Sequence, residues 1–120
     1  MSADLLLQHL NEIDIVASRI QRFIEDMTEP QFASDEKTQS AVMMGLVLIG
    51  EAIAKIDSDD PGFLEQTPDI SWRQLIELRD LIFDDAYRID SSTIWNAASK
   101  RIPDLQVRLS LLRNWHAQGE

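Results

Sequence analysis

The sequence contains no cysteine, and this absence excludes both disulfide bonds and thiolate metal sites. We also expect no secretory leader, because the N-terminal stretch MSADLLLQHLNEIDIV lacks a basic flank and interrupts its apolar residues with polar ones. No apolar run approaches the roughly twenty residues that are needed to span a bilayer. We therefore expect a soluble, cytoplasmic protein that does not enter a membrane.

Positive charge and histidine are scarce as well. The chain has 11 Lys and Arg against 21 Asp and Glu, which gives a formal net charge of -10. This balance argues against a nucleic-acid binder with a broad basic surface, since phosphate binding needs Lys and Arg to neutralise the backbone. Any contact with RNA would be confined to a local cleft. The only histidines are His9 and His116, and we expect both to be ordinary surface side chains.

Helical periodicity runs through almost all of the 120 residues, which suffice for one domain but not for two. The pattern predicts helices over 3–27 and 35–56, a third from Ser71 to Tyr87, a short fourth with Ile94, Trp95 and Ala98, and a last one that begins at Pro103. Leu105, Leu109, Leu112 and Trp115 form the stripe of the last helix. We therefore expect an all-α fold, an up-and-down bundle of four to five helices, as a single domain over residues 1–120.

The helix boundaries carry their own signals. Pro30 breaks the first helical pattern, and Ser34 is the expected N-cap of the second helix. Ser71 and Gln74 have the spacing of a capping box at the start of the third helix. Residues 57–70, DSDDPGFLEQTPDI, are expected to form a loop. The second helix is apolar on two sides, which indicates that it is buried centrally or shared with another chain.

Arg79 is a lone cation within the apolar pattern of the third helix, and Asp84 and Asp85 follow it along the chain. A charged residue seldom points into a core unless it is paired or catalytic. The role of Arg79 therefore bears directly on whether the protein is an enzyme.

Four segments together resemble consecutive blocks of the HepT-like toxins of the HEPN superfamily, namely DEKTQSAV, IGEAIAKI, ISWRQLIELRDLIFDDAYRIDSSTIW and IPDL. The resemblance implies an all-helical bundle, usually a homodimer, with a metal-independent RNase motif Arg-x4-His-x-Tyr on its third helix and no cofactor. It also implies a partner, an MNT-type nucleotidyltransferase that acts as antitoxin by adding AMP to the motif tyrosine. RNA, either tRNA or mRNA, is the implied substrate.

The motif positions can be matched residue by residue. Arg79 matches the motif arginine, and Trp72 and Trp95 match the tryptophans on either side of the motif. No gap is needed between these two tryptophans to match the family pattern, which argues against a shifted alignment of the motif. The rest of the motif is therefore expected in register on the same helix.

The chain departs from the family pattern at the residues that carry the chemistry. Asp80 stands where asparagine is usual, Asp84 where the histidine should be and Ala86 where the tyrosine should be, while Tyr87 comes one residue late. RNA cleavage by an internal hydroxyl needs a proton taken from the 2′-oxygen and another given to the leaving oxygen, a task for a group that titrates near neutrality. A carboxyl with an ordinary pKa of about 3.9 is a poor replacement, and a carboxylate near Arg79 would neutralise the cation.

Several interpretations of the charged residues remain open. We favour Arg79 as a buried structural cation paired with Glu51, Asp80 or Asp84 over Arg79 as a working catalytic group. Glu51 either faces Arg79 across the bundle or is a solvated helix residue. A magnesium site built from Asp80, Asp84 and Asp85 is disfavoured, because the three do not share one helical face.

Two classes of function follow. The first is the toxin subunit of a HEPN/MNT toxin–antitoxin pair, an RNase by descent that is inactive because its motif is broken. The second is a non-catalytic HEPN module that only binds a partner such as the nucleotidyltransferase. The catalytic positions are then Arg79, Asp84 and Ala86, and the residues that line or support the substrate groove are Glu51, Asp80, Asp85 and Tyr87.

Overall fold

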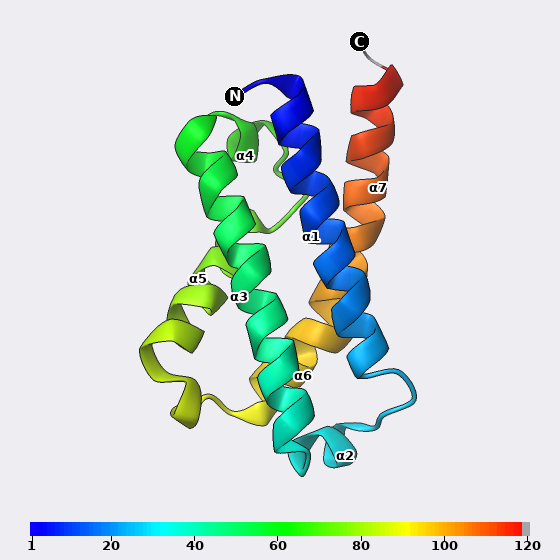
Figure 1. The fold of residues 1–120 in the computed structure, drawn as a ribbon, viewed down its shortest axis with the longest axis vertical. Coiled ribbons are helices and arrows are strands. Elements are labelled where there is room, and N and C mark those ends of the chain that lie inside the picture. Colours follow the sequence, from blue (N-terminus) through cyan, green and yellow to red (C-terminus); the bar gives the residue numbers. More distant parts are fainter. Residues whose placement is uncertain (119–120) are drawn as a thin grey trace.

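The computed structural model describes residues 1–118, with side chains up to residue 114, and within this range the chain forms helices and no strand (Figure 1). In chain order the elements are α1 (Ala3–Phe23), α2 (Glu29–Ala33), α3 (Glu36–Asp59), α4 (Phe63–Gln66), α5 (Trp72–Asp85), the 3-10 turn η1 (Ala86–Arg88), α6 (Ser91–Asn96), the π-helical turn η2 (Ala97–Arg101) and α7 (Ile102–Gln118). The long helices run alternately up and down, so the expected all-α up-and-down bundle is confirmed.

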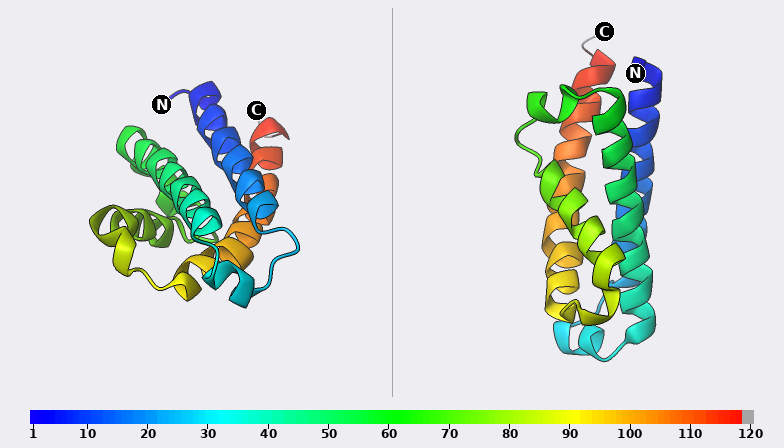
Figure 2. Two further views of the ribbon diagram at one scale, coloured as in Figure 1. Left: turned by 60° about the horizontal axis from the view of Figure 1, so that its bottom comes forward. Right: turned by 90° about the vertical axis from the view of Figure 1, so that its left-hand side faces the viewer.

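The long helices contact one another in the order α7, α1, α3 and α5. Figure 2 shows α5 on the outer side of α3, while α6 and η2 cross the end of the bundle that lies opposite both termini. α3 therefore lies between α1 and α5, and its buried residues are Val42, Gly45, Leu46, Ile49, Gly50, Ala52, Ile53 and Ile56. Of the two alternatives for this helix, central burial is confirmed, while sharing with another chain stays a prediction.

α3 also meets the criteria of length and hydropathy for a membrane span, so the expectation that no segment is long and apolar enough is wrong. The sequence reasoning counted uninterrupted apolar residues, whereas a helix with few charges can meet the criterion on average. The central helix of a globular bundle meets the same criterion, because it is apolar on more than one side.

The turn between α1 and α3 differs from the sequence prediction. α1 ends at Phe23 rather than near residue 27, and the chain then reverses through Asp26, whose φ of 61° is left-handed. Pro30 does not break a helix but lies in the first turn of α2, where its missing N–H costs no hydrogen bond. α2 begins with a capping box, because Thr28 Oγ1 accepts a hydrogen bond from the Gln31 amide and the Gln31 side chain accepts one from the Thr28 amide.

Asp35, and not Ser34, caps the N-terminus of α3. The Asp35 carboxylate accepts hydrogen bonds from the Thr38 amide at 3.0 Å and from the Thr38 hydroxyl at 2.6 Å. These two bonds, the hydroxyl one first, hold the pKa of Asp35 below its usual range. Ser34 instead ends α2, where its hydroxyl donates to the backbone carbonyls of Pro30 and Gln31.

The segment expected to be a loop, residues 57–70, contains the end of α3 and the short helix α4. Ser71 precedes α5 but its side chain makes no capping hydrogen bond, so the predicted capping box is wrong. The entry to α5 is fixed by Trp72 instead, whose indole N–H donates to Thr67 Oγ1 at 2.8 Å and whose ring packs on Phe63 at a centroid distance of 6.1 Å. Tertiary contacts have replaced the local cap.

The C-terminal third is one nearly continuous helical path from α6 to α7. The Asp90 carboxylate caps α6 by accepting a hydrogen bond from the Ser92 amide at 3.1 Å. The segment RIDSST, which was expected to interrupt the helices, therefore also contains the start of α6. α7 begins at Ile102, one residue before the predicted start at Pro103, and η2 leads directly into it. The side chains of Trp115 and His116 lie outside the described residues, so their expected roles stay predictions.

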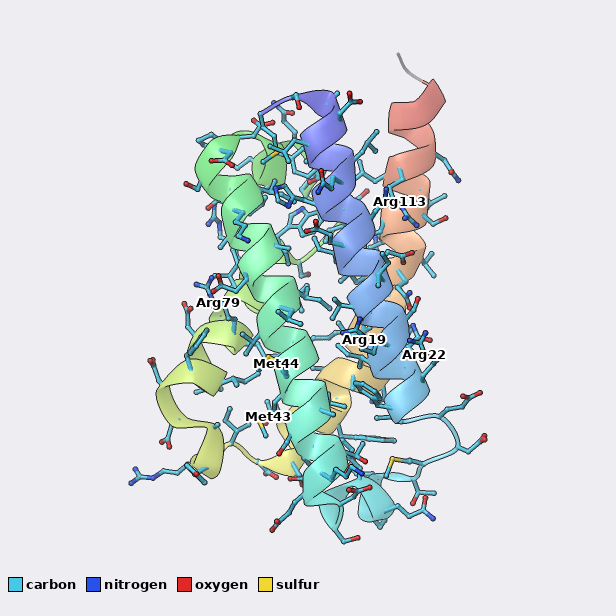
Figure 3. The ribbon with its side chains drawn as sticks, in the orientation of Figure 1. Arg19, Arg22, Met43, Met44, Arg79 and Arg113 are labelled. Atoms are coloured by element: carbon cyan, nitrogen blue, oxygen red, sulfur yellow. The ribbon has the colours of Figure 1, made fainter. Side chains whose placement is uncertain are left out.

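Polar groups tie α7 to α1. Gln106 donates to Asp14 Oδ1 at 3.1 Å and to Ser18 Oγ at 2.9 Å. Arg113, labelled in Figure 3, donates to Asn11 and to the other oxygen of Asp14. Because hydrogen bonds require particular partners, this seam fixes the register of α7 along α1.

Candidate functional site

Arg79 lies where α5 packs against α3, and its side chain is only 17% exposed (Figure 3). The stem of this side chain lies against Gly50 of α3. A Cβ atom on Gly50 would come within 2.5 Å of the Arg79 Cβ, which is closer than such atoms approach. The absence of a side chain at Gly50 therefore allows α5 to bring Arg79 directly onto the α3 backbone.

All three guanidinium nitrogens of Arg79 donate to carboxylates. Nη1 donates to Glu51 Oε1 at 3.2 Å, while Nε and Nη2 donate to the same Asp80 oxygen at 2.9 and 2.7 Å. The favoured interpretation is confirmed for the pairing of the cation with Glu51 and Asp80, whereas the expected full burial is not, because Arg79 is only partly buried. Of the two alternatives for Glu51, the one in which it faces Arg79 across the bundle is confirmed, although its side chain also stays partly in water.

The two carboxylates are nevertheless well hydrated, since the Glu51 side chain is 47% exposed and that of Asp80 is 55% exposed. An ion pair with such exposed partners contributes about 1 kcal/mol or less, because water screens it. The cluster is therefore a partly open surface feature rather than a buried charge network.

Asp84 does not contact Arg79, contrary to the expectation that it would neutralise this cation. It follows Arg79 by five residues, which places it about 140° around α5. Asp84 is exposed and makes no ion pair or hydrogen bond among the described residues. Asp85 lies 3.7 Å from Arg88 Nε at the end of α5, so it is also separate from the Arg79 cluster.

Ala86 and Tyr87 both lie in the 3-10 turn η1, because α5 ends at Asp85. The assumption that the α-helix continues through Tyr87 is therefore wrong. The Tyr87 side chain is fully exposed and makes no hydrogen bond or ring contact within the described part of the chain. Asp84 and Ala86, which stand where the resemblance implies histidine and tyrosine, are both exposed to solvent.

His9 is not the exposed surface side chain that its type suggests, since only 12% of it is accessible. It lies on α1 with Nδ1 3.4 Å from Glu12 Oε2, and no hydrogen bond or ion pair joins it to Arg79 in the part of the chain that is described. Among the described side chains, no group of three or more His, Asp or Glu residues is arranged to hold a metal ion.

Exposed apolar side chains lie on the same two helices as the Arg79 cluster, at helical spacing from its members. On α3, Met44 and Leu48 precede Glu51 at helical spacing, and they are 59% and 41% exposed. On α5, Phe83 lies one turn after Arg79 and is 67% exposed. We call the surface formed by Met44, Leu48, Glu51, Arg79 and Phe83 the Arg79 face. It combines a partly shielded cation with apolar side chains that a monomer leaves in water.

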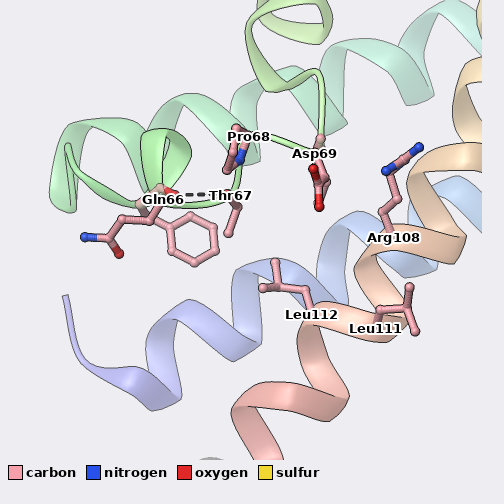
Figure 4. A pocket seen from close by; sticks show the side chains of 9 residues that line it. Gln66, Thr67, Pro68, Asp69, Arg108, Leu111 and Leu112 are labelled. Carbon is pink, nitrogen blue, oxygen red and sulfur yellow. Dashed lines mark hydrogen bonds between the residues drawn. The ribbon is translucent and has the colours of Figure 1, made fainter.

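Two hollows lie elsewhere on the molecule. One, of about 480 Å³, lies between the α4 segment and α7 and is lined by residues that include Phe63, Ile70 and Arg108 (Figure 4). The other, of about 590 Å³, lies between α5 and the α6–η2 segment and includes Glu77 and Arg101. Neither hollow is lined by a residue of the Arg79 face.

The sequence reasoning missed Gly50 as part of this site. The signal for it was a glycine inside a long helical pattern. Such a glycine lowers the stability of the helix, and its presence there indicates that another segment packs closely against it. The partner of that approach, Arg79, comes from a helix far along the chain, and periodicity alone does not pair the two.

Comparison with known proteins gives a consistent result. The family described as "Ribonuclease HepT-like" matches residues 13–112. A protein of Thermococcus cleftensis named "Probable ribonuclease HepT" is 30% identical over 88% of this chain and 93% of its own length. A Methanocaldococcus jannaschii protein whose name assigns it provisionally as an RNase is 33% identical over 68% of this chain and 65% of its own length. No solved structure matches the chain.

Proposed function

The chain belongs to the ribonuclease HepT-like family, and from this premise we propose that it is the toxin subunit of a toxin–antitoxin pair. In this proposal the chain is a single HEPN domain over residues 1–120 that works in the cytoplasm and is an RNase by descent. The observation that carries the proposal is Arg79, which stands in the register of the motif arginine and lies on an exposed face of α3 and α5.

The proposed chemistry is cleavage of RNA by its own 2′-hydroxyl, without a metal ion. In this reaction the guanidinium of Arg79 meets the scissile phosphate, and a second group moves protons between the attacking and leaving oxygens. Asp84 occupies the position of that second group, where the resemblance implies a histidine, the side chain suited to proton transfer near neutrality. Ala86 has no polar side-chain atom. We therefore propose that the chain as it stands is catalytically silent.

The proposed assembly is a homodimer formed through the Arg79 face. Apolar side chains that are exposed in one chain gain free energy when a second copy covers them. A two-fold axis through this face would bring two Arg79 side chains to one groove. The proposed second partner is an MNT-type nucleotidyltransferase that binds the dimer as antitoxin.

A second candidate function is a non-catalytic HEPN module that binds the nucleotidyltransferase only. The observation that favours it is the state of the motif, in which aspartate and alanine replace the histidine and the tyrosine that the resemblance implies. RNA would then not be a substrate.

One experiment separates the two candidates. The unmodified chain is expected to show little or no cleavage of tRNA or single-stranded RNA. The double change Asp84→His with Ala86→Tyr is expected to raise cleavage by about 100-fold to 10,000-fold, the usual contribution of general acid–base catalysis. A matched variant, Asp84→Asn with Ala86→Tyr, removes the same charge but supplies no proton-transfer group and is expected to stay silent.

The controls make the result specific. EDTA must leave the restored cleavage unchanged, and adding Arg79→Ala must abolish it. If the restored variant folds and dimerises but cleaves no RNA, the binding module replaces the toxin. If the unmodified chain already cleaves RNA efficiently, the proposal that Asp84 silences it is wrong.

A further inference from the structure

We propose that Asp80 closes the phosphate-binding edge of Arg79, so that RNA must displace an internal carboxylate before it reaches the cation. This inference rests on the proposed RNA-binding role of the Arg79 face. It assigns different tasks to the two carboxylates that contact the guanidinium, and these tasks follow from which nitrogens each one occupies.

The edge of a guanidinium formed by Nε and Nη2 presents two parallel N–H groups, which suit two oxygens of a carboxylate or phosphate. In this chain both N–H groups of that edge donate to Asp80 Oδ1, at 2.9 and 2.7 Å. Glu51 instead accepts from Nη1, on the other side of the guanidinium, at 3.2 Å. Asp80 therefore occupies the place that a phosphodiester would take, while Glu51 holds the cation from α3.

The packing of the Arg79 side chain keeps its guanidinium next to Asp80. Its stem lies against Gly50, where there is no room for even one more carbon atom, and most of the side chain is covered. Asp80 is the next residue along α5, and more than half of its side chain faces water. An anion that arrives from solvent consequently meets the carboxylate of Asp80 before it meets the guanidinium.

The exposure of Asp80 also determines how strongly its carboxylate holds the guanidinium. Ion pairs with exposed partners are weak, so opening this one requires little free energy. We expect release of the Nε–Nη2 edge to strengthen anion binding by about twofold to fivefold, which corresponds to the usual range for an exposed ion pair. The closure would therefore weaken the binding of RNA rather than prevent it.

The chain contains a matched control for long-range charge. Asp80→Asn and Asp84→Asn each remove one negative charge from α5, and the two positions are one helical turn apart. Only Asp80 contacts Arg79, whereas Asp84 makes no ion pair among the described residues. A difference between these two variants therefore reports the contact and not the net charge.

The first measurement uses inorganic phosphate as the probe and the ¹⁵N NMR signal of the Arg79 Nε–H group as the readout, at low ionic strength. The signal is assigned through its loss in Arg79→Lys. In Asp80→Asn the midpoint of the phosphate titration is expected about twofold to fivefold lower than in the unmodified chain and in Asp84→Asn. Equal midpoints in the two variants would overturn the proposal.

The second measurement uses a fluorescein-labelled uridine dodecanucleotide and fluorescence anisotropy with the same three proteins. Tighter binding by Asp80→Asn than by Asp84→Asn supports both the closure and the RNA-binding role. If Asp80→Asn binds phosphate more tightly but gains nothing on RNA, the closure stands and the proposed role in RNA binding fails. If both variants gain equally on RNA, the effect is long-range charge and the closure is wrong.

Discussion

Gly50 and Gly45 are both buried glycines of α3, but a side chain at each would meet a different obstacle. At Gly50 the obstacle is the Arg79 Cβ, which is attached directly to the α5 backbone. At Gly45 it is the end of the Ile20 side chain, with Cγ1 at 2.7 Å and Cδ1 at 2.9 Å. A side chain can adjust its rotamer, whereas a Cβ atom moves only with its helix.

Gly50→Ala is therefore expected to destabilise the fold by about 1–3 kcal/mol, the usual cost of overpacking a core. Gly45→Ala is the matched control and is expected to cost less, because the Ile20 side chain can adjust its rotamer, while the gain of about 1 kcal/mol in helix propensity is common to both variants. Urea denaturation of both variants measures the difference. The close approach at Arg79 would not be a constraint if Gly50→Ala proved as stable as Gly45→Ala.

At the scale of the element, the N-terminus of α3 depends on the ionised carboxylate of Asp35. The Thr38 hydroxyl, followed by the Thr38 amide, lowers the pKa of Asp35 by hydrogen bonding to the charged form. A carboxyl whose pKa is lowered by folding stabilises the native state fully above its unfolded pKa of about 3.9. This contribution is lost as the pH falls through the lowered folded value.

Asp35→Ala is accordingly expected to lower the melting temperature at pH 7, and the difference from the unmodified chain should shrink below about pH 4. Ser34→Ala is the neighbouring control. It removes hydrogen bonds from an exposed residue at the end of α2 and is expected to have little effect at either pH. Thermal melts followed by circular dichroism from pH 7 to pH 2.5 test this. A difference that stays constant down to pH 2.5 would exclude a role for the charge.

The end of α5 at Asp85 determines how Tyr87 is presented. In the 3-10 turn that follows, one residue corresponds to about 120° of rotation, so Tyr87 and Ala86 face different directions. We expect an MNT-type nucleotidyltransferase to transfer AMP poorly to the unmodified chain, although the Tyr87 ring is exposed.

The variant that combines Ala86→Tyr with Tyr87→Ala moves the hydroxyl back by one residue and is expected to accept AMP. Mass spectrometry of both proteins after incubation with the enzyme and ATP compares them directly. Efficient modification at Tyr87 of the unmodified chain would show that the register does not matter.

At the scale of the whole molecule, the Arg79 face leaves apolar side chains exposed on two adjacent helices. We expect light scattering at micromolar concentration to give twice the 13.7 kDa mass of one chain. Met44→Glu is expected to shift the protein toward monomer, because a charge on the covered face would lose its hydration. Ile15→Glu, at an equally exposed position on α1, is the control and should leave the mass unchanged. A strict monomer in the unmodified chain would refute the proposed dimer.

The helical fold follows from patterns that are local in sequence. The stripe of α1, for example Leu6, Leu10 and Ile13, recurs every three or four residues and is buried in the bundle. The helix boundaries were harder to predict from the sequence, because short helices such as α2 and α4 have too few residues for a period to be recognised.

The candidate site could also be predicted from the sequence only in part. Periodicity and motif register were enough to single out Arg79, Glu51 and Asp80 as a group, because they stand out as charges within apolar helical patterns. The expected contact with Asp84 was wrong, because a spacing of five residues directs a side chain to another side of the same helix. Helical geometry could have excluded this contact before the structure was known.

By itself, the sequence determined that the protein is an all-helical bundle, since helical periodicity depends on local spacing. It also determined that aspartate and alanine stand at positions 84 and 86, where the resemblance implies histidine and tyrosine. The tertiary structure decided that Gly50 receives the stem of Arg79, that Glu51 and Asp80 share its guanidinium, and that α5 ends before Tyr87. The physical reason is that each of these features depends on how closely and in what register two helices pack, which side-chain volumes and distant partners decide together.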